Sequence, residues 1–220
     1  MILDRVNPRW QGHTVIVAAT GVSLTPDVAE TCRRSRCPII AVSDAYRLLP
    51  FADILYSCDG AWWDVHKGCP DFRGEKWSSH GEPGANDKRV HGERYGLTLV
   101  RGSHCNSGPP AGRCADGGTF STDPTHIHYG GNSGFQAINL ALLFGARRII
   151  LVGFNMDSGG HFFGAHPKGL RNVDHSKSVM TFTHAWRHLP AGVEIINATP
   201  GSRLRGFPRM SLEDALMVPA

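Results

Sequence analysis

The chain has 220 residues, of which 41% are hydrophobic and 19% charged, and its net charge is +4. This composition is typical of a folded globular domain and excludes a largely disordered chain. No apolar run reaches membrane-spanning length, and the N-terminus lacks the pattern of a secretory signal. We therefore expect a single domain over residues 1–220, located in the cytoplasm and without a membrane partner. The composition leaves the oligomeric state open.

The first elements are a strand, a turn of small residues and a helix. Residues 14–19 form an apolar run rich in β-branched side chains, and Gly21 and Ser23 lie in the turn after it. Thr25 is suited to cap a helix that begins at Pro26, because proline is tolerated in the first helical turn. This order of elements opens nucleotide-binding α/β folds.

Two more strands are predicted over residues 38–43 and 52–57, and each leads into an aspartate, Asp44 or Asp59. The carboxyl ends of parallel strands meet at one edge of a sheet, so we expect both aspartates to line one crevice with the first turn. The alternative is that they cap helices or turns, which is a common role of aspartate.

The middle of the chain, residues 68–125, is rich in Gly, Pro, Ser, His and charged residues, and its hydrophobic periodicity fades. Only residues 97–100 predict a short strand, so we expect a long, loop-rich insertion that is either functional or disordered. Cys105 and Cys114 could form a partial metal site with His104. Reduced thiols fit better, because a structural zinc site needs four ligands.

A glycine pair at 130–131 leads into an apolar segment that ends at Gly145. Asn132 or Ser133 is suited to cap this segment as a helix, and residues 149–152 predict a buried strand after it. The free N–H groups and partial positive charge at the start of a helix favour a phosphate or carboxylate. The glycines could equally form only a tight turn before a core helix.

The last third of the chain continues the alternation, with a helix over 176–189, a strand over 193–197 and a short helix over 211–216. Together the elements predict an α/β fold with a Rossmann-like, doubly wound, mostly parallel sheet. Asn197 and Thr199 lie at the end of the last strand. They would contact a nucleobase there, or only form the turn before a proline.

Two pairs of residues allow more than one interpretation. His161 and His166 follow the central strand and could contact a phosphate, or bind a divalent metal together with Asp157. We favour phosphate contact, because the spacing of the two histidines is not that of a helical metal motif. Trp62 and Trp63 could stack on a base or sugar ring, or pack in the core.

Five short segments resemble a group of bacteriophage proteins of about this length, and the resemblance extends over nearly the whole chain except the middle loop. The segments are 14–24, 44–46, 132–134, 153–156 and 197–202. More remotely, the order of elements is similar to that of the Campylobacter-type bacterial sialyltransferases, the motility-associated glycosyltransferases and the archaeal 6-hydroxymethylpterin pyrophosphokinases. This resemblance implies a Rossmann-like domain that binds a nucleotide-activated donor.

The sialyltransferase resemblance implies roles for particular positions. The turn after the first strand and the end of the second would contact the nucleotide, and the loop before the central helix would contact the donor sugar and phosphate. Together with the other strand-end residues, the expected donor-binding residues are Gly21, Ser23, Asp44, Asp59, Asn132, Ser133, Asn155, Asn197 and Thr199.

The resemblance also implies a general base, a histidine at the head of a late helix, which here is His175 in the triplet Asp174-His175-Ser176. Imidazole has a pKa suited to taking the proton of an acceptor hydroxyl. The alternative is that Asp174 only caps a solvated helix on which His175 is exposed.

One position departs from the sialyltransferase pattern, in which tyrosines lie near the leaving phosphate. This chain has Phe162 and Phe163 in that region. Because phenylalanine cannot donate a hydrogen bond, other side chains would stabilise the leaving group, and the donor need not be a sialyl nucleotide. The candidates are His161, His166, Lys168 and Arg171.

We therefore predict a glycosyltransferase that uses a nucleotide sugar as co-substrate, with no required cofactor and no bound metal. The phage resemblance and the positive charge suggest a hydroxymethylated base in phage DNA as the acceptor, and hence the host cytoplasm. One alternative is a pyrophosphokinase that uses ATP and Mg²⁺ held by Asp44, Asp59 or Asp157. Another is a non-catalytic phage protein that binds and sequesters a nucleotide.

Overall fold

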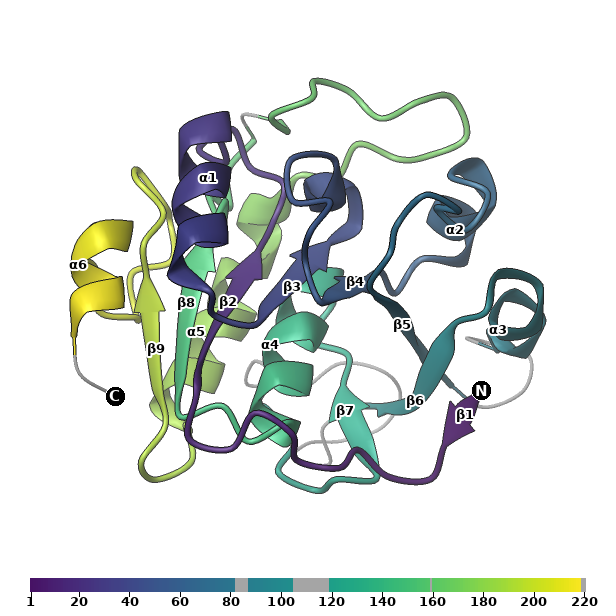
Figure 1. Cartoon of the computed structure of the whole chain (residues 1–220), viewed down its shortest axis with the longest axis horizontal. Helices are drawn as coiled ribbons and strands as arrows, with labels where there is room; N and C mark the ends of the chain where they lie inside the picture. Colours follow the sequence, from purple (N-terminus) through teal and green to yellow (C-terminus); the bar gives the residue numbers. More distant parts are fainter. Residues whose placement is uncertain (82–86, 105–118, 159, 219–220) are drawn as a thin grey trace.

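A single parallel sheet organises the chain, which a computed structural model describes over residues 1–81, 87–104, 119–158 and 160–218 (Figure 1). Across the described sheet the strand order is β1-β6-β5-β4-β3-β2-β8-β9, and β7 pairs with β6. Every one of these pairs is parallel. The strands are β1 (Ile2–Leu3), β2 (Thr14–Ala18), β3 (Ile39–Val42), β4 (Ile54–Tyr56), β5 (Glu75–His80), β6 (Thr98–Ser103), β7 (His126–His128), β8 (Arg148–Val152) and β9 (Glu194–Asn197).

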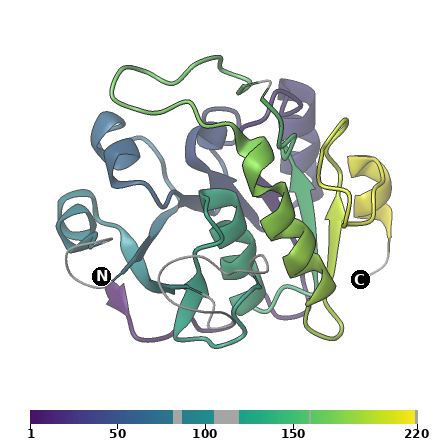
Figure 2. The ribbon, with the colours of Figure 1, turned by 180° about the vertical axis from the view of Figure 1, so that it is seen from behind.

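Helices cover both faces of the sheet, as the doubly wound prediction requires. Helices α4 and α5 lie on the face turned to the viewer in Figure 2, and α1 and α6 lie on the opposite face (Figures 1 and 2). No helix in the described segments combines the length and the apolarity needed to cross a bilayer. The helices are α1 (Pro26–Ser35), η1 (Ser43–Arg47), α2 (Gly60–Val65), α3 (Arg89–Tyr95), α4 (Ser133–Leu143), η2 (His175–Ser178), α5 (Val179–Arg187) and α6 (Leu212–Met217).

Two apolar cores form, one on each face, because side chains alternate along a strand. In β2, Val15 and Val17 belong to the core that includes residues of α4 and α5. Ile16 and Ala18 belong to the core that includes residues of α1 and α6. All four side chains are buried. A shift of one residue would exchange the two sets, so burial on both faces fixes the register of this central strand.

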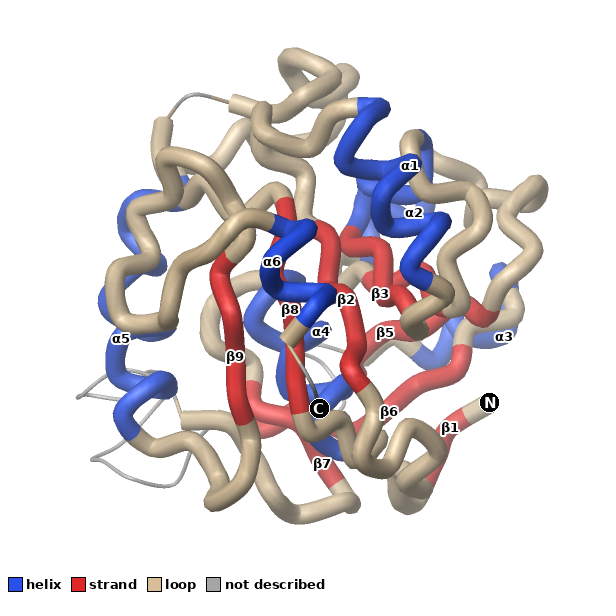
Figure 3. Tube along the Cα trace, turned by 60° about the vertical axis from the view of Figure 1, so that its left-hand side comes forward, coloured by secondary structure: helices blue, strands red, loops and turns tan. Residues whose placement is uncertain are grey.

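Strand β2 lies where the strand order reverses. The chain runs from β2 through β3, β4 and β5 to β6 on one side, and later adds β8 and β9 on the other. Figure 3 shows β2, β8 and β9 side by side, with α6 in front of them. In an open parallel sheet, ligands bind beyond the carboxyl ends of the strands at such a reversal. The segment 160–174 arches over this edge (Figure 1).

The predicted helix caps are confirmed. The Thr25 side chain accepts a hydrogen bond from Val28 N at 3.3 Å, and α1 begins at Pro26. Asn132 caps α4, and Gly145 has a φ of 90° just beyond the C-terminus of that helix. The strands predicted over 14–19, 38–43, 52–57, 97–100, 149–152 and 193–197 correspond to β2, β3, β4, β6, β8 and β9.

The segment 68–125 was expected to be loop-rich with a single strand over 97–100, but it also supplies β5 and α3, which were not predicted. Strand β5 is polar in sequence, since Ser78 and Ser79 occupy buried positions where periodicity normally places apolar side chains. Their hydroxyl groups donate instead to Ser57 O and Gln136 Oε1, each at 2.7 Å. Buried hydroxyls with such partners avoid the cost of desolvation, but they hide the strand from a hydrophobic pattern.

Candidate active site

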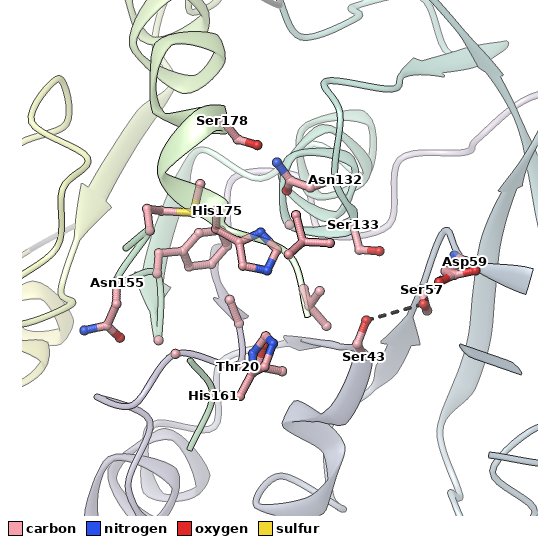
Figure 4. A pocket seen from close by; sticks show the side chains of 18 of the residues that line it. Thr20, Ser43, Ser57, Asp59, Asn132, Ser133, Asn155, His161, His175 and Ser178 are labelled. Atoms are coloured by element: carbon pink, nitrogen blue, oxygen red, sulfur yellow. Dashed lines mark hydrogen bonds between the residues drawn. The ribbon is translucent and has the colours of Figure 1, made fainter. Parts of the chain in front are cut away.

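A pocket of about 270 Å³ lies at the carboxyl edge of the sheet (Figure 4). The residues after β2, β3, β4 and β8, the first turn of α4 and the segment 157–178 surround it. The predicted site residues that line it are Gly21, Asp59, Trp62, Asn132, Ser133, Asn155, His161, His166, Arg171 and His175. The predicted residues that do not line it are Ser23, Asp44, Trp63, Lys168, Asn197 and Thr199.

Gly21 joins the loops that follow β2 and β8. Its N–H donates to Gly153 O at 2.8 Å. A Cβ atom at Gly21 would lie 2.2 Å from Asn155 Oδ1 and 2.5 Å from Gly153 O, so only glycine permits this approach. Ser23 lies outside the pocket lining, where its N–H and hydroxyl donate to Asn155 Oδ1 at 3.2 and 2.7 Å. Asn155 is thereby fixed at the pocket edge.

The first turn of α4 presents polar groups to the pocket. Asn132 Oδ1 accepts from Phe135 N at 2.9 Å, which orients the Asn132 side chain. Asn132 Nδ2 is buried and has no hydrogen-bond partner in the described residues. The Ser133 hydroxyl accepts from Cys58 N at 3.0 Å and so ties α4 to the end of β4. An unpaired buried amide beside a helix N-terminus is suited to an anionic ligand.

Two histidines of the pocket are held in their neutral form. His161 is buried, and its Nδ1 lies 2.8 Å from Thr20 Oγ1. Burial, with smaller effects from His166 and His175, lowers the pKa of His161 to about 4. Burial also lowers the pKa of His175, and the charge of His166 acts in the same direction. Both imidazoles are therefore unprotonated near neutral pH, which is the form that a general base requires.

Each of the two interpretations of residues 174–176, a helix cap and a general base in the pocket, fits one of these residues. Asp174 Oδ1 accepts from Ser176 N at 3.0 Å, so Asp174 does cap the helical segment that begins at His175. The His175 side chain is nevertheless only partly exposed and faces the pocket, with its ring centroid 5.8 Å from that of His161 (Figure 4). The solvated-helix interpretation therefore holds for Asp174 but not for His175.

Asp44 departs from the expectation that it lines the crevice. Its carboxylate is buried below the pocket lining, where Asp44 Oδ2 accepts from Trp62 Nε1 at 2.7 Å. Trp62, which makes this contact, itself lines the pocket. Asp59 does line the pocket, and its Oδ1 also accepts from Ala61 N at 2.9 Å, so the capping alternative is confirmed for Asp59 only.

The remaining predicted residues outside the pocket are mostly structural in their contacts. Trp63 is buried and its Nε1 donates to Ser57 O at 3.0 Å. Thr199 Oγ1 accepts from Phe154 N at 3.0 Å, and Asn197 Oδ1 accepts from Thr199 N at 3.1 Å. These bonds agree with the turn interpretation. Lys168 is exposed.

Several pocket residues were not predicted from the sequence. They include Thr20, Ser43, Ser57, Cys58 and Ser178. The first four directly follow β2, β3 or β4, so the rule that selected the aspartates would have found them if extended to hydroxyl and thiol side chains. The Ser43 hydroxyl donates to Ser57 Oγ at 3.3 Å (Figure 4). Ser43 also has a φ of 48°, a left-handed conformation that is uncommon for serine.

The metal interpretations find no support in the described residues. Within them, no group of three or more His, Cys, Asp or Glu side chains is arranged to hold a metal ion. His161, His166 and Asp157 therefore line one pocket without forming such a group. The site suggested by Cys105 and Cys114 lies outside the residues that the structure describes. Cys32, Cys37, Cys58 and Cys69 are free thiols.

Comparison with known proteins supports the fold. No protein-family model and no curated protein sequence matches the chain. The chain is similar to the solved structure of the MAf glycosyltransferase from Magnetospirillum magneticum AMB-1, with a TM-score of 0.59 and 16% sequence identity. The match covers 99% of this chain and 36% of that one, so the chain spans about a third of the length of its structural relative. The predicted resemblance to motility-associated glycosyltransferases is thereby confirmed at the level of the Rossmann-like fold.

Proposed function

We propose that the protein is a glycosyltransferase that moves a sugar from a nucleotide-activated donor to a hydroxyl group. One observation carries the proposal: the first turn of α4 and the neutral imidazole of His175 face the same pocket (Figure 4). The first suits a phosphate and the second suits a general base. The similarity of the fold to a MAf glycosyltransferase favours this class of enzyme.

In this proposal the donor lies along the ends of β2 and β8. Its phosphate accepts hydrogen bonds from Asn132 Nδ2 and from the first N–H groups of α4, apart from that of Phe135, which Asn132 Oδ1 already accepts. The absence of a side chain at Gly21 lets the loop after β8 approach this turn, which holds Asn155 at the edge of the proposed nucleotide site. Asn155 and Asp59 border the pocket and are proposed to contact the nucleoside.

The transfer step uses groups that line the pocket. The imidazole of His175 takes the proton of the acceptor hydroxyl while the acceptor oxygen attacks the anomeric carbon of the donor sugar. The bond between that carbon and the donor phosphate oxygen breaks, and its electron pair stays on the departing nucleotide. Arg171 and the first turn of α4 offset the negative charge that develops there.

We further propose that the acceptor is a hydroxymethylated base in phage DNA, flipped into the pocket. The motif resemblance to bacteriophage proteins supports this choice, as does the net charge of +4. Exposed cations near the pocket also favour an anionic acceptor. Lys168 follows the pocket residue His166. Hydrogen bonds from Ser176 lower the pKa of the Asp174 carboxyl group, and the nearby charges of Lys177 and Arg203 lower it further.

The proposal is tested by a thermal-shift screen of nucleotides and nucleotide sugars, with and without Mg²⁺, followed by mass spectrometry of DNA and saccharide acceptors. Ligands that bind only the folded state raise the melting temperature. We expect a nucleotide sugar to raise it without Mg²⁺, and an acceptor to gain the mass of one sugar. Stabilisation by ATP only with Mg²⁺ would favour the pyrophosphokinase alternative. Binding without any turnover would favour nucleotide sequestration.

A further inference from the structure

A buried polar cluster lies beneath the pocket, centred on Asp44, whose side chain is 1% exposed. Trp62 Nε1 donates to Asp44 Oδ2 at 2.7 Å. His66 Nε2 lies 3.5 Å from Asp44 Oδ1, and His166 Nδ1 lies 3.9 Å from Asp44 Oδ2. Arg47 Nη1 approaches Asp44 Oδ1 at 3.8 Å from the solvent side. The carboxylate thus faces groups from η1, α2 and the segment 157–174.

The two imidazoles face the carboxylate with atoms that have no other partner. Asp44 Oδ1, His66 Nε2 and His166 Nδ1 are all buried and lack a hydrogen bond in the described residues. A buried carboxylate is costly unless a cationic or hydrogen-bonding group compensates it. The separations of 3.5 and 3.9 Å exceed hydrogen-bond length by roughly 1 Å or less. A small shift of either ring would therefore complete an Asp–His pair.

Only one of the two histidines also reaches the pocket. His166 lines it, whereas His66 does not. The Nδ1 edge of His166 faces Asp44, so the opposite edge of the ring is the one available to the pocket. His166 N donates to Asn172 Oδ1 at 2.9 Å, and the ring lies 4.5 Å from that of His161, centroid to centroid. Asp44, Asn172 and His161 therefore all contact His166 beside the pocket.

We propose that Asp44 is a positioning residue that holds His166 with its Nε2 directed at the phosphate of the bound donor. This inference rests on the proposed glycosyltransferase function. When the bond between the anomeric carbon and the phosphate oxygen breaks, the electron pair passes to that oxygen, and His166 Nε2–H donates a hydrogen bond to it. The Asp44 carboxylate fixes the orientation of the His166 ring, as carboxylates do for catalytic histidines. No proton transfer is needed.

The test compares the binding of a nucleotide with that of its own nucleoside, which isolates the phosphate. AMP, CMP, GMP and UMP are screened by calorimetry, and the best ligand is then paired with the nucleoside that lacks its phosphate. We expect Asp44→Asn and His166→Asn to weaken binding of the nucleotide about tenfold, because one charge-assisted hydrogen bond is lost. Binding of the nucleoside should be unchanged. The matched control is Asp71→Asn, which alters an exposed carboxylate.

The outcomes separate this inference from the proposed function. If Asp44→Asn weakens the binding of nucleotide and of nucleoside by the same factor, Asp44 only supports the shape of the pocket and the proposal is wrong. If the variant binds both ligands as tightly as the parent, the proposal is also wrong. If Asp44→Asn does not fold, the His166→Asn variant tests the proposal instead, because His166 lies in a surface segment.

In turnover assays, both variants should lower kcat more than they raise KM. Suppose that His175→Ala abolishes transfer while Asp44→Asn and His166→Asn bind the nucleotide more tightly than the nucleoside by the same factor as the parent. Then this inference is wrong and the proposed function stands. If the parent protein binds no nucleotide or nucleotide sugar, the proposed function falls with it.

Discussion

The pocket has two sides that are built differently. The strand-end side consists of Gly21, Asn132, Ser133 and Asn155, which follow strands or begin α4. Main-chain groups hold it in place, as in the bond from Gly21 N to Gly153 O at 2.8 Å. The histidine side is the segment 157–178. A main-chain bond from Phe162 N to Thr20 O at 3.0 Å ties it to the turn after β2. Its imidazoles are held by side chains, through the contact of Thr20 with His161 at 2.8 Å and through ring contacts among its histidines and Phe163.

This difference indicates a division of labour. Hydrogen bonds of the sheet and of a helix cap place donors accurately, so the strand-end side is suited to binding. Side-chain packing sets how far each imidazole is removed from water, so the histidine side is suited to controlling protonation. Apart from the proposed contact of His166 with the phosphate, binding and reaction should therefore be separable by mutation. Each prediction below either separates the two sides or shows that they cannot be separated.

The largest effect is expected for His175→Ala. Loss of the proposed general base should lower kcat by about a hundredfold or more, because positioned bases contribute roughly 10²- to 10⁴-fold. The affinity for the nucleotide donor should change little, since the strand-end side is untouched. Steady-state kinetics and calorimetry check the two halves of the prediction. His188→Ala, at an exposed histidine beyond α5, is the control. If His175→Ala kept full activity, the histidine side would not supply the base, and the proposed division between a binding side and a reacting side would be wrong.

Gly21→Ala is expected to damage binding rather than chemistry. Its Cβ would lie 2.2 Å from Asn155 Oδ1 and 2.5 Å from the main-chain oxygen of Gly153, so the two loops must move apart. Such overpacking costs roughly 1–3 kcal/mol of stability. We expect a lower melting temperature and at least about a tenfold weaker nucleotide affinity. Val22→Ala, at an exposed neighbour in the same turn, should alter neither quantity.

A third prediction concerns the pH dependence of stability. The pKa of His161 falls from 6.5 to about 4 on folding, so between these values the unfolded chain binds a proton that the folded protein resists. The free energy of unfolding should therefore decrease as the pH falls from 6.5 towards 4, by about 3 kcal/mol in full. Urea unfolding at several pH values measures this slope. His161→Gln should flatten it, and an unchanged slope would contradict the assigned burial. The acid limb of activity should likewise lie below pH 6.5, because burial lowers the pKa of His175.

The smallest effect is expected for variants of Asn132, which caps α4 and is proposed to donate to the phosphate. Asn132→Asp keeps an oxygen that accepts from Phe135 N but replaces the unpaired Nδ2 group, whereas Asn132→Ala removes both. We expect a stability loss of about 1 kcal/mol for alanine and little for aspartate, which is also a good cap. Both variants should bind nucleotide more weakly than the parent, as calorimetry would show. If aspartate binds as well as asparagine, Nδ2 has no part in phosphate binding.

The fold was largely predictable because its central strands are apolar on both faces. Runs such as residues 14–19 and 149–152 leave little choice but a buried parallel strand. Strand β5 was not predicted, because its buried residues Ser78 and Ser79 are polar. Their hydroxyl groups are satisfied by hydrogen bonds with Ser57 and Gln136, which lie elsewhere in the chain. No local pattern carries that information.

The site was predictable to a similar degree. Residues placed by the main chain, such as Gly21 and Asn132, follow from the positions of strand ends and helix caps. Asp44 also follows a strand, but its carboxylate turns toward Trp62 and away from the pocket. His66 gave no signal, because its importance depends on a carboxylate on a different element. Side-chain direction is decided by tertiary partners, and a single sequence does not reveal those partners.

The central position of β2 has a consequence for synthesis of the protein. In the sheet Ile16 pairs with Ile39 on one side and with Ile150 on the other, and Ile150 emerges from the ribosome much later than Ile39. Until then a nascent chain carries an open, apolar strand edge, which is a surface that promotes aggregation and that chaperones cover. The turn after β2, where we propose that the nucleotide binds, needs Gly153 as well. A ligand can therefore rescue a destabilised variant only after most of the chain has been translated.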